Sequence, residues 1–199
     1  GHNIGWKLAS VLNGQAHEAL LDSYTPERRG ATLDVFTNAK KSTRFMTPPS
    51  HGWQVARDAA LSLALTRKSA GMLANPRQMT PYTYADSPIT APDDPAFKVG
   101  PKPGAMFSDV ALEAGFLGDH LGQSFTLIIF GEALDLQQTD LTQVALPADG
   151  TAAEIYGATE GSAYLIRPDL HIAARWHQVT AEKVTSFLTE LHGQKVEAK

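Results

Sequence analysis

The run Phe125-Thr-Leu-Ile-Ile-Phe130 is the stretch of sequence that bears most directly on the fold. It is apolar and rich in β-forming residues, with one threonine as its only polar member, and Gly131 follows it directly. A continuous run of this kind is typical of a central strand that is buried on both faces of a sheet. We therefore expect a sheet in the C-terminal half of the chain, with this run as a central strand.

Neighbouring patterns extend that sheet. Residues 144–146 form a short apolar stretch that indicates a second strand. The runs 163–167 and 172–176 flank Pro168-Asp169, and proline in that place is typical of a type I turn between two strands. We expect these two runs to form a hairpin.

A helix is expected to follow the hairpin. Thr180 is a candidate N-cap, and apolar residues recur after it at helical spacing until Gly193. These residues are Val184, Phe187, Leu188 and Leu191. The order strand, connection, strand, hairpin, helix predicts a thioredoxin-like α/β domain over residues 106–199. Because the chain has no cysteine, this domain would lack a CxxC motif.

Residues 1–74 have helical periodicity instead. Asn13-Gly14 indicates the end of a first short helix, and residues 17–23 indicate a second. Thr25-Pro26 is typical of an N-cap followed by proline at the first helical position.

The helix that this signal starts is expected to end near Met46, before Pro48-Pro49. Ser50 is a candidate cap for a third helix that continues to Gly71.

Residues 75–105 connect these two parts. Seven of the chain's twelve prolines lie between Asn75 and Pro103, which makes regular structure improbable there. Apolar residues within this stretch predict that it is pinned to a surface as an extended linker: Met79, Tyr82, Tyr84 and Ile89.

Composition excludes several functions. The formal net charge is −4, with 17 basic and 21 acidic residues, which argues against broad binding of nucleic acid or an anionic membrane. Without cysteine there is no disulfide, thiolate metal site or cysteine nucleophile. No apolar run has the ~20 residues of a membrane helix, and no secretory pattern opens the chain. We therefore expect a soluble cytoplasmic protein.

Local motifs do not predict an active site. Asp119-His120 with Ser124 has the residue types of a hydrolytic triad, but three polar residues before a strand are typical of a loop. Glu27-Arg28-Arg29 could bind a phosphate or a carboxylate, although a structural salt-bridge cluster is the favoured interpretation.

The glycines and histidines do not predict a binding site either. Gly115, Gly118 and Gly122 follow no strand, so a phosphate-binding loop is not expected. The seven histidines show no metal-ligand spacing, and His171, just after a turn, is expected to face solvent. The residues alone therefore assign no catalytic, cofactor-binding or metal-binding side chain.

Several strings, in this order, resemble FAD-dependent aromatic-ring hydroxylases of the phenol hydroxylase and 3-(3-hydroxyphenyl)propionate hydroxylase type. Residues 1–9 (Gly-His-Asn-Ile-Gly-Trp-Lys-Leu-Ala) and 20–29 (Leu-Leu-Asp-Ser-Tyr-Thr-Pro-Glu-Arg-Arg) are similar to the end of their flavin domain. Residues 100–104, 125–131 and 156–173 resemble parts of their C-terminal region. Gly30 departs from the pattern, which usually has proline there.

The resemblance implies a C-terminal portion of an FAD- and NAD(P)H-dependent monooxygenase that hydroxylates a phenol-like ring. The chain opens with Gly1 and not Met, and it holds neither GxGxxG nor the family's later Gly-Asp motif. We thus expect a piece of a longer enzyme, itself inactive and free of FAD and NAD(P)H, whose aromatic substrate binds the missing N-terminal part. It would consist of a helical remnant over residues 1–74, the linker 75–105 and the thioredoxin-like domain 106–199.

The resemblance also implies structural roles. Tyr24, Glu27 and Arg28 would stabilise a junction between helices, and Trp6 would pack into the flavin-domain core. The C-terminal domain would contribute to a homodimer. The alternative is a flavin-free interaction or dimerisation module, and a third option is a small-ligand carrier.

Overall fold

The computed structural model describes residues 1–74, 81–136 and 141–193. Two compact units make up the chain. The first combines residues 1–27 with residues 83–199, and the second comprises residues 28–82. The expected mixture of helices followed by a sheet is confirmed.

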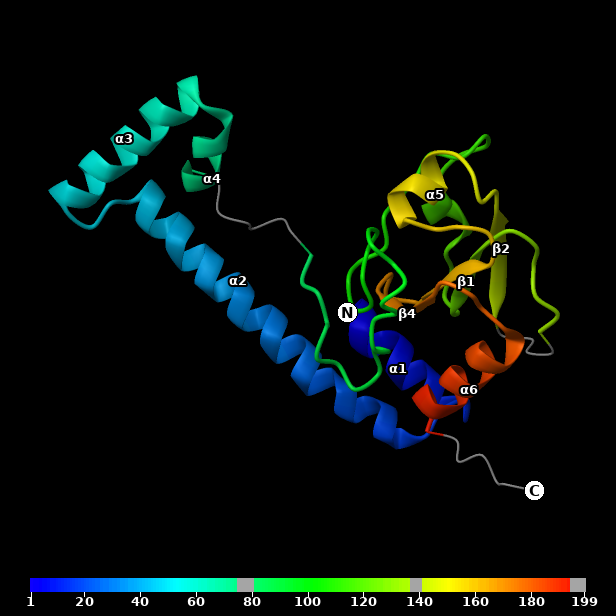
Figure 1. Ribbon diagram of the computed structural model, residues 1–199. Coiled ribbons are helices and arrows are strands. Elements are labelled where there is room, and N and C mark those ends of the chain that lie inside the picture. The colour runs from blue at the N-terminus through cyan, green and yellow to red at the C-terminus, as the bar shows by residue number, and fades with distance from the viewer. Residues whose placement is uncertain (75–80, 137–140, 194–199) are drawn as a thin grey trace. The chain divides into compact units, whose positions relative to one another are not determined.

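The first unit contains a four-stranded sheet (Figure 1). Its strands are β1 (Thr126–Phe130), β2 (Thr142–Leu146), β3 (Ser162–Ile166) and β4 (Ile172–Trp176), in the spatial order β2-β1-β3-β4. β1 runs parallel to β2 and antiparallel to β3, and β4 is antiparallel to β3. All five residues of β1 are buried and β1 lies between β2 and β3, so the predicted central strand is confirmed. The strand β2 confirms the predicted second strand, and the antiparallel pair β3 and β4 confirms the predicted hairpin.

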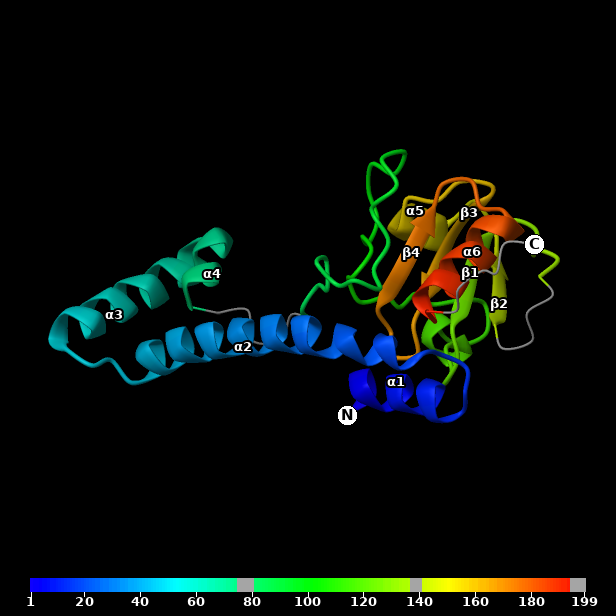
Figure 2. The same ribbon diagram turned by 90° about the horizontal axis from the view of Figure 1, so that it is seen from below.

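Alternate residues of β1 face two different apolar cores. Leu127 and Ile129 pack in a core that includes Val184 and Leu188 of α6 (Ala181–Leu191) and Trp6 of α1 (His2–Leu12). On the other face, Ile128 and Phe130 join a core with residues of the short helix α5 (Thr151–Tyr156). Figure 2 shows helices on both sides of the sheet. The sheet is therefore a middle layer.

The helices agree with the sequence to different degrees. Thr180 caps α6 as expected, its side chain accepting a hydrogen bond from the Lys183 N–H at 3.3 Å. α6 ends at Leu191, two residues before Gly193, which has a φ of +68°. α5 was not predicted, because it has six residues and its N-cap is Gly150, without a capping side chain.

The N-terminal helices follow the predicted order. α1 ends next to Asn13, and a 3₁₀ helix spans Glu18–Ser23. α2 covers Tyr24–Met46, so it starts before Thr25, and the prediction of Thr25 as N-cap is wrong. Pro26 still lies in the first turn, where its missing N–H is not needed.

Two further helices follow α2. α3 covers His51–Thr66 after Ser50, and it ends earlier than the predicted Gly71. A 3₁₀ turn (Lys68–Ala70) and the short α4 (Gly71–Ala74) come next.

The second unit exposes much apolar surface. α3 has no buried residue. Exposed large apolar side chains of this unit include Leu33, Val35, Phe36, Met46, Trp53, Val55, Leu61, Leu63, Leu65, Met72 and Leu73. Helices in proteins gain most of their stability by packing an apolar face. This unit therefore offers surface that a partner could cover.

The proline-rich segment is pinned to the first unit where it is described. Residues 81–103 form no helix or strand, and Met79 lies outside the described residues. The Ala91 N–H donates to the Ala173 carbonyl at 2.8 Å, along the edge strand β4. Tyr84 and Ile89 are buried. The linker thus covers an otherwise open sheet edge.

Arg175, in the strand β4, also binds the proline-rich linker. Its guanidinium donates to both carboxylate oxygens of Asp93, at 2.7 and 3.0 Å. It also donates to the carbonyls of Val99 and Pro101. One buried side chain therefore contacts the linker at several points.

No helix within the described ranges is long and apolar enough to span a bilayer.

Candidate functional site

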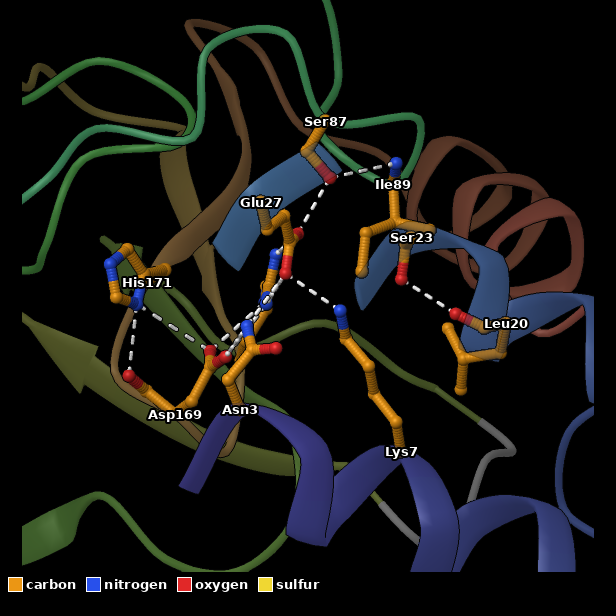
Figure 3. Close-up of polar contacts among 10 residues, drawn as sticks. Asn3, Lys7, Leu20, Ser23, Glu27, Ser87, Ile89, Asp169 and His171 are labelled. Atoms are coloured by element: carbon orange, nitrogen blue, oxygen red, sulfur yellow. Dashed lines mark hydrogen bonds and ion pairs between the residues drawn. The ribbon is translucent and has the colours of Figure 1, made fainter. Parts of the chain in front are cut away.

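A carboxylate at the start of α2 is the centre of a buried polar cluster (Figure 3). Glu27 Oε2 accepts hydrogen bonds from Lys7 Nζ and Asn3 Nδ2, each at 2.6 Å. Its Oε1 accepts from Ser87 Oγ and Arg167 Nη1, also at 2.6 Å. We call Asn3, Lys7, Glu27, Ser87, Arg167 and Asp169 the Glu27 cluster.

Arg167 joins Glu27 to a second carboxylate. Its Nε and Nη2 donate to Asp169 Oδ1 and Oδ2 at 3.0 and 2.7 Å. Its guanidinium carbon lies 5.4 Å from the ring centroid of Trp6 and 5.5 Å from that of Tyr84. The guanidinium is therefore bound in its plane by carboxylates and lies near aromatic rings, a setting that suits arginine better than lysine.

Four segments contribute to the cluster, all within the first unit. Asn3 and Lys7 are four residues apart, so they share one face of α1. Glu27 lies in the first turn of α2 and Ser87 in the linker. Arg167 and Asp169 belong to the turn between β3 and β4. Arg167 thus contacts the carboxylate of Glu27, although the two residues are 140 positions apart in the sequence.

The charges are buried and balanced. The side chains of Lys7, Glu27 and Arg167 have 0% exposure, and that of Asp169 has 3%. Two cations therefore face two carboxylates. A buried ion pair of this kind is costly to break because removing one partner leaves an uncompensated charge.

The pKa values follow from these contacts. Burial alone would raise the pKa of Glu27, but hydrogen bonds and charge from Arg167, with help from Asn3 and Lys7, lower it to about 2. Burial likewise opposes ionisation of Asp169, yet hydrogen bonding from His171 and the charge of Arg167 hold its pKa well below the usual range. Burial lowers the pKa of Lys7, and Glu27 opposes this shift. Both carboxyls are ionised at neutral pH.

His171 adjoins the cluster, and its predicted exposure is wrong. The residue is buried, and its Nδ1 lies 3.0 Å from the Asp169 carbonyl oxygen. Its ring stacks on Tyr84 with centroids 4.3 Å apart. The linker covers this side of the turn, which a sequence pattern could not indicate.

The cluster suits a structural task. A general acid or base needs access to a substrate and a pKa near the working pH. The carboxylates of the cluster have neither, because they are shielded from solvent and fully ionised. Glu27 thus belongs to a buried salt-bridge cluster, and its ion-pair partners there are Lys7 and Arg167 from distant segments.

Other candidates have local roles. Asp119 Oδ2 accepts a hydrogen bond from the Phe116 N–H at 2.8 Å, which caps the 3₁₀ turn Leu117–His120. This contact supports the loop interpretation of Asp119-His120. Across the residues that the structure describes, no three His, Asp or Glu side chains gather as a metal site.

Trp6 departs from its expected place. Its ring packs edge-on against Phe125 at 5.4 Å, inside the sheet unit of this chain. The expectation that it packs into a flavin-domain core is wrong. The strand order of the sheet brought Phe125 to this position, which no local pattern at residues 1–12 could predict.

The fold of this chain is similar to that of solved enzymes that bind flavin. The fold matches the aklavinone-11 hydroxylase, solved with FAD and aklavinone, with a TM-score of 0.71 and 24% identity over 96% of this chain and 38% of that one. It matches the rebeccamycin biosynthetic enzyme RebC with a TM-score of 0.68 and 23% identity over 98% of this chain and 40% of that one.

The sequence matches agree. Residues 1–39 match the family model described as FAD binding domain. A 6-methylpretetramide 4-monooxygenase of Streptomyces rimosus is 26% identical over 96% of this chain and 40% of its own length. A 3-(3-hydroxy-phenyl)propionate/3-hydroxycinnamic acid hydroxylase of Mycolicibacterium vanbaalenii is 43% identical over 65 residues, 31% of this chain and 11% of that protein. The resemblance to FAD-dependent aromatic hydroxylases is therefore confirmed, and the chain spans at most about two fifths of these relatives.

Three polar side chains of the segment that matches the FAD binding domain bond within the sheet unit. Within the segment that matches the FAD binding domain, the side chains of Lys7 and Glu27 are fully buried and paired. The Asn3 amide nitrogen donates to Glu27 and Asp169. Asn3, Lys7 and Glu27 therefore bond to one another and to Asp169 inside the sheet unit.

Proposed function

We propose that this chain is the C-terminal part of an FAD- and NAD(P)H-dependent monooxygenase that hydroxylates a phenol-like aromatic ring. The observation that carries this proposal is the 26% identity with a monooxygenase over 96% of the chain. A separate match of residues 1–39 to an FAD binding domain supports it. The shared fold with flavin-dependent enzymes supports it. NAD(P)H and an aromatic substrate would bind the N-terminal part of that enzyme.

Within such an enzyme, this chain would have a structural role. The Glu27 cluster supports this, because its four charged groups are paired with one another and shielded from solvent. By itself the chain would be inactive and would bind neither FAD nor NAD(P)H. It would work in the cytoplasm.

The domain organisation is part of this proposal. We assign residues 1–74 to the end of the catalytic region, residues 75–105 to a linker, and residues 106–199 to a thioredoxin-like domain without CxxC. The strand order β2-β1-β3-β4, with one parallel pair and an antiparallel hairpin, supports the last assignment.

The test begins with the coding DNA upstream of the Gly1 codon. We expect an open frame of several hundred codons that encodes GxGxxG and a Gly-Asp motif. The purified longer protein should contain FAD and should consume O₂ with NAD(P)H in the presence of a phenol. A start codon close to Gly1 would contradict the proposal.

A stand-alone interaction or homodimerisation module is the second candidate. The many large apolar side chains exposed on the second unit favour it, because exposed apolar surface is a feature of interaction sites. Sedimentation of the 199-residue chain tests this candidate. A monomer at high concentration would argue against it, whereas a concentration-dependent dimer would support it.

A further inference from the structure

The two units of the chain carry opposite charge. Residues 28–82, the second unit, hold nine basic and two acidic residues, which gives a formal net charge of +7. The rest of the chain, which makes up the first unit, holds eight basic and nineteen acidic residues, which gives −11. The small total of −4 is therefore the difference between a basic unit and a strongly acidic one.

Helix α2 presents basic and apolar side chains on one exposed face. Leu33, Phe36, Lys40 and Arg44 follow one another at intervals of three and four residues, so they lie along one side of the helix. All four are exposed, Leu33 at 58% and Phe36 at 68%. We call these four residues the α2 stripe. Its composition suits a partner surface that is acidic and can also cover apolar area.

The carboxylates of the second unit do not balance its cations. Asp34 accepts a hydrogen bond from Asn38 at 3.2 Å, and Asp58 accepts one from Arg57 at 2.9 Å. These are the only two acidic residues of this unit in the sequence. Contact between the second units of two copies would therefore bring like charges together, whereas contact with the first unit of another copy would bring opposite charges together.

Several loops of the first unit meet at one edge of its sheet. β1 and β2 end at this edge because they are parallel, and the antiparallel pairings place the start of β3 and the end of β4 there as well. The Gly131 N–H donates to the Leu146 carbonyl at 2.9 Å, and the Gly161 N–H donates to the Phe130 carbonyl at 2.8 Å. These bonds hold the loops side by side.

This edge of the sheet is acidic. The segments that adjoin it, residues 131–136, 147–161 and 177–183, hold six acidic residues and one lysine. All six acidic residues are exposed, and we call them the acidic edge: Glu132, Asp135, Asp149, Glu154, Glu160 and Glu182.

We propose that the α2 stripe of one copy of this chain binds the acidic edge of a second copy, and the reverse. The inference rests on the second candidate function, the homodimerisation module, and it names the two surfaces that meet. Opposite charges attract and orient the copies, and burial of Leu33 and Phe36 adds apolar contact. The dimer is therefore sensitive to salt, which screens exposed charges.

Reversed charges test both surfaces in the 199-residue chain. The stripe variant combines Lys40→Glu with Lys41→Glu, and the edge variant combines Glu132→Lys with Glu160→Lys. All four positions are exposed. Glutamate and lysine have similar helix propensities, so α2 should form in the stripe variant.

The control variant combines Glu18→Lys with Asp22→Lys, which makes the same change of charge as the edge variant. Both residues are exposed. The His17 N–H donates to the His192 carbonyl at 2.7 Å, so this segment lies at the C-terminal end of α6. The acidic edge adjoins the other end of that helix.

Sedimentation equilibrium measures the dissociation constant of the dimer. In the unsubstituted chain, raising the salt concentration from about 0.05 M to about 0.5 M should weaken the dimer about tenfold or more. The stripe variant and the edge variant should each weaken it by about tenfold or more at low salt, and the control should not. An equal mixture of the stripe and edge variants should restore the dimer, because their reversed surfaces complement each other.

The outcomes separate this inference from the candidate function on which it rests. A dimer that responds to neither salt nor charge reversal, or a mixture that restores nothing, refutes the pairing of these surfaces and leaves the homodimerisation module intact. A monomer at every salt concentration refutes both. If the 199-residue chain dimerises but the longer reading frame yields a monomer, another part of the longer protein covers the α2 stripe, and the assignment to a second copy is overturned.

Discussion

Glu27 and Arg167 lie 140 residues apart in the sequence, and two pairs of their atoms bond at 2.6 and 3.1 Å in the interior of the protein. Glu27 comes from the first turn of α2, whereas Arg167 comes from the turn between β3 and β4. Their ion pair therefore ties the N-terminal helices to the sheet.

Arg167→Met should destabilise the chain by about 3–5 kcal/mol, because Glu27 and Asp169 would lose the cation they share. Urea unfolding followed by circular dichroism measures the change. Lys102→Ala is the control, since Lys102 is 74% exposed and 4.0 Å from Asp93. A loss below about 1 kcal/mol in Arg167→Met, within the range of ordinary surface pairs, would show that the ion pair is not essential.

Glu27→Gln combined with Arg167→Met should be less harmful than the sum of the two single substitutions. Each single change leaves a buried charge without its partner, and the double change removes both charges. A double-mutant cycle from urea unfolding should give a coupling free energy of about 1 kcal/mol or more. Additive effects would mean that the two side chains act independently.

Acid should unfold the first unit through the same carboxyls. The pKa of Glu27 falls from its ordinary 4.5 to about 2 in the folded chain, so its contribution is complete above pH 4.5 and is lost as the pH falls through about 2. Asp169 has a lowered pKa as well and acts in the same direction. The free energy of unfolding, measured between pH 7 and 2, should decline less steeply in Glu27→Gln. Parallel curves for the two proteins would contradict this.

Gly104→Ala should destabilise the chain by about 2 kcal/mol or more, because φ at this position is +84° and a Cβ would lie 2.5 Å from the Tyr84 carbonyl carbon. Gly122→Ala is the control, since its added Cβ meets no atom within 4 Å. The melting temperatures of both variants, measured by thermal unfolding, test this prediction. Equal melting temperatures would show that the backbone at Gly104 can relax.

Arg175→Gln should loosen the linker. Arg175 bonds to Asp93 and to linker carbonyls, and these contacts hold Lys98 and Lys102 near the sheet edge. Trypsin should therefore cut after Lys98, which precedes Val99, faster in the variant than in the unsubstituted chain, whereas Lys102 precedes Pro103 and is not a trypsin site. Arg57→Gln, in α3, serves as the control. Unchanged cleavage in Arg175→Gln would mean that backbone contacts alone hold the segment.

Local sequence patterns determined much of the secondary structure. The apolar run at residues 125–130 predicted β1, Pro168-Asp169 predicted the hairpin, and Thr180 predicted the start of α6. Each of these signals depends on residues a few positions apart, and the physical preferences behind them act at that range. α5 was missed because its short sequence between glycines has no such signal.

Only the tertiary structure decided which side chains meet. It buried His171 against Tyr84, placed Trp6 on Phe125, and brought Glu27 to Arg167. No periodicity predicts such contacts, because they depend on strand order and on the path of the linker. A buried charge is stable only where its partner is also buried, so the sequence could supply both residues of this ion pair but only the folded chain could pair them.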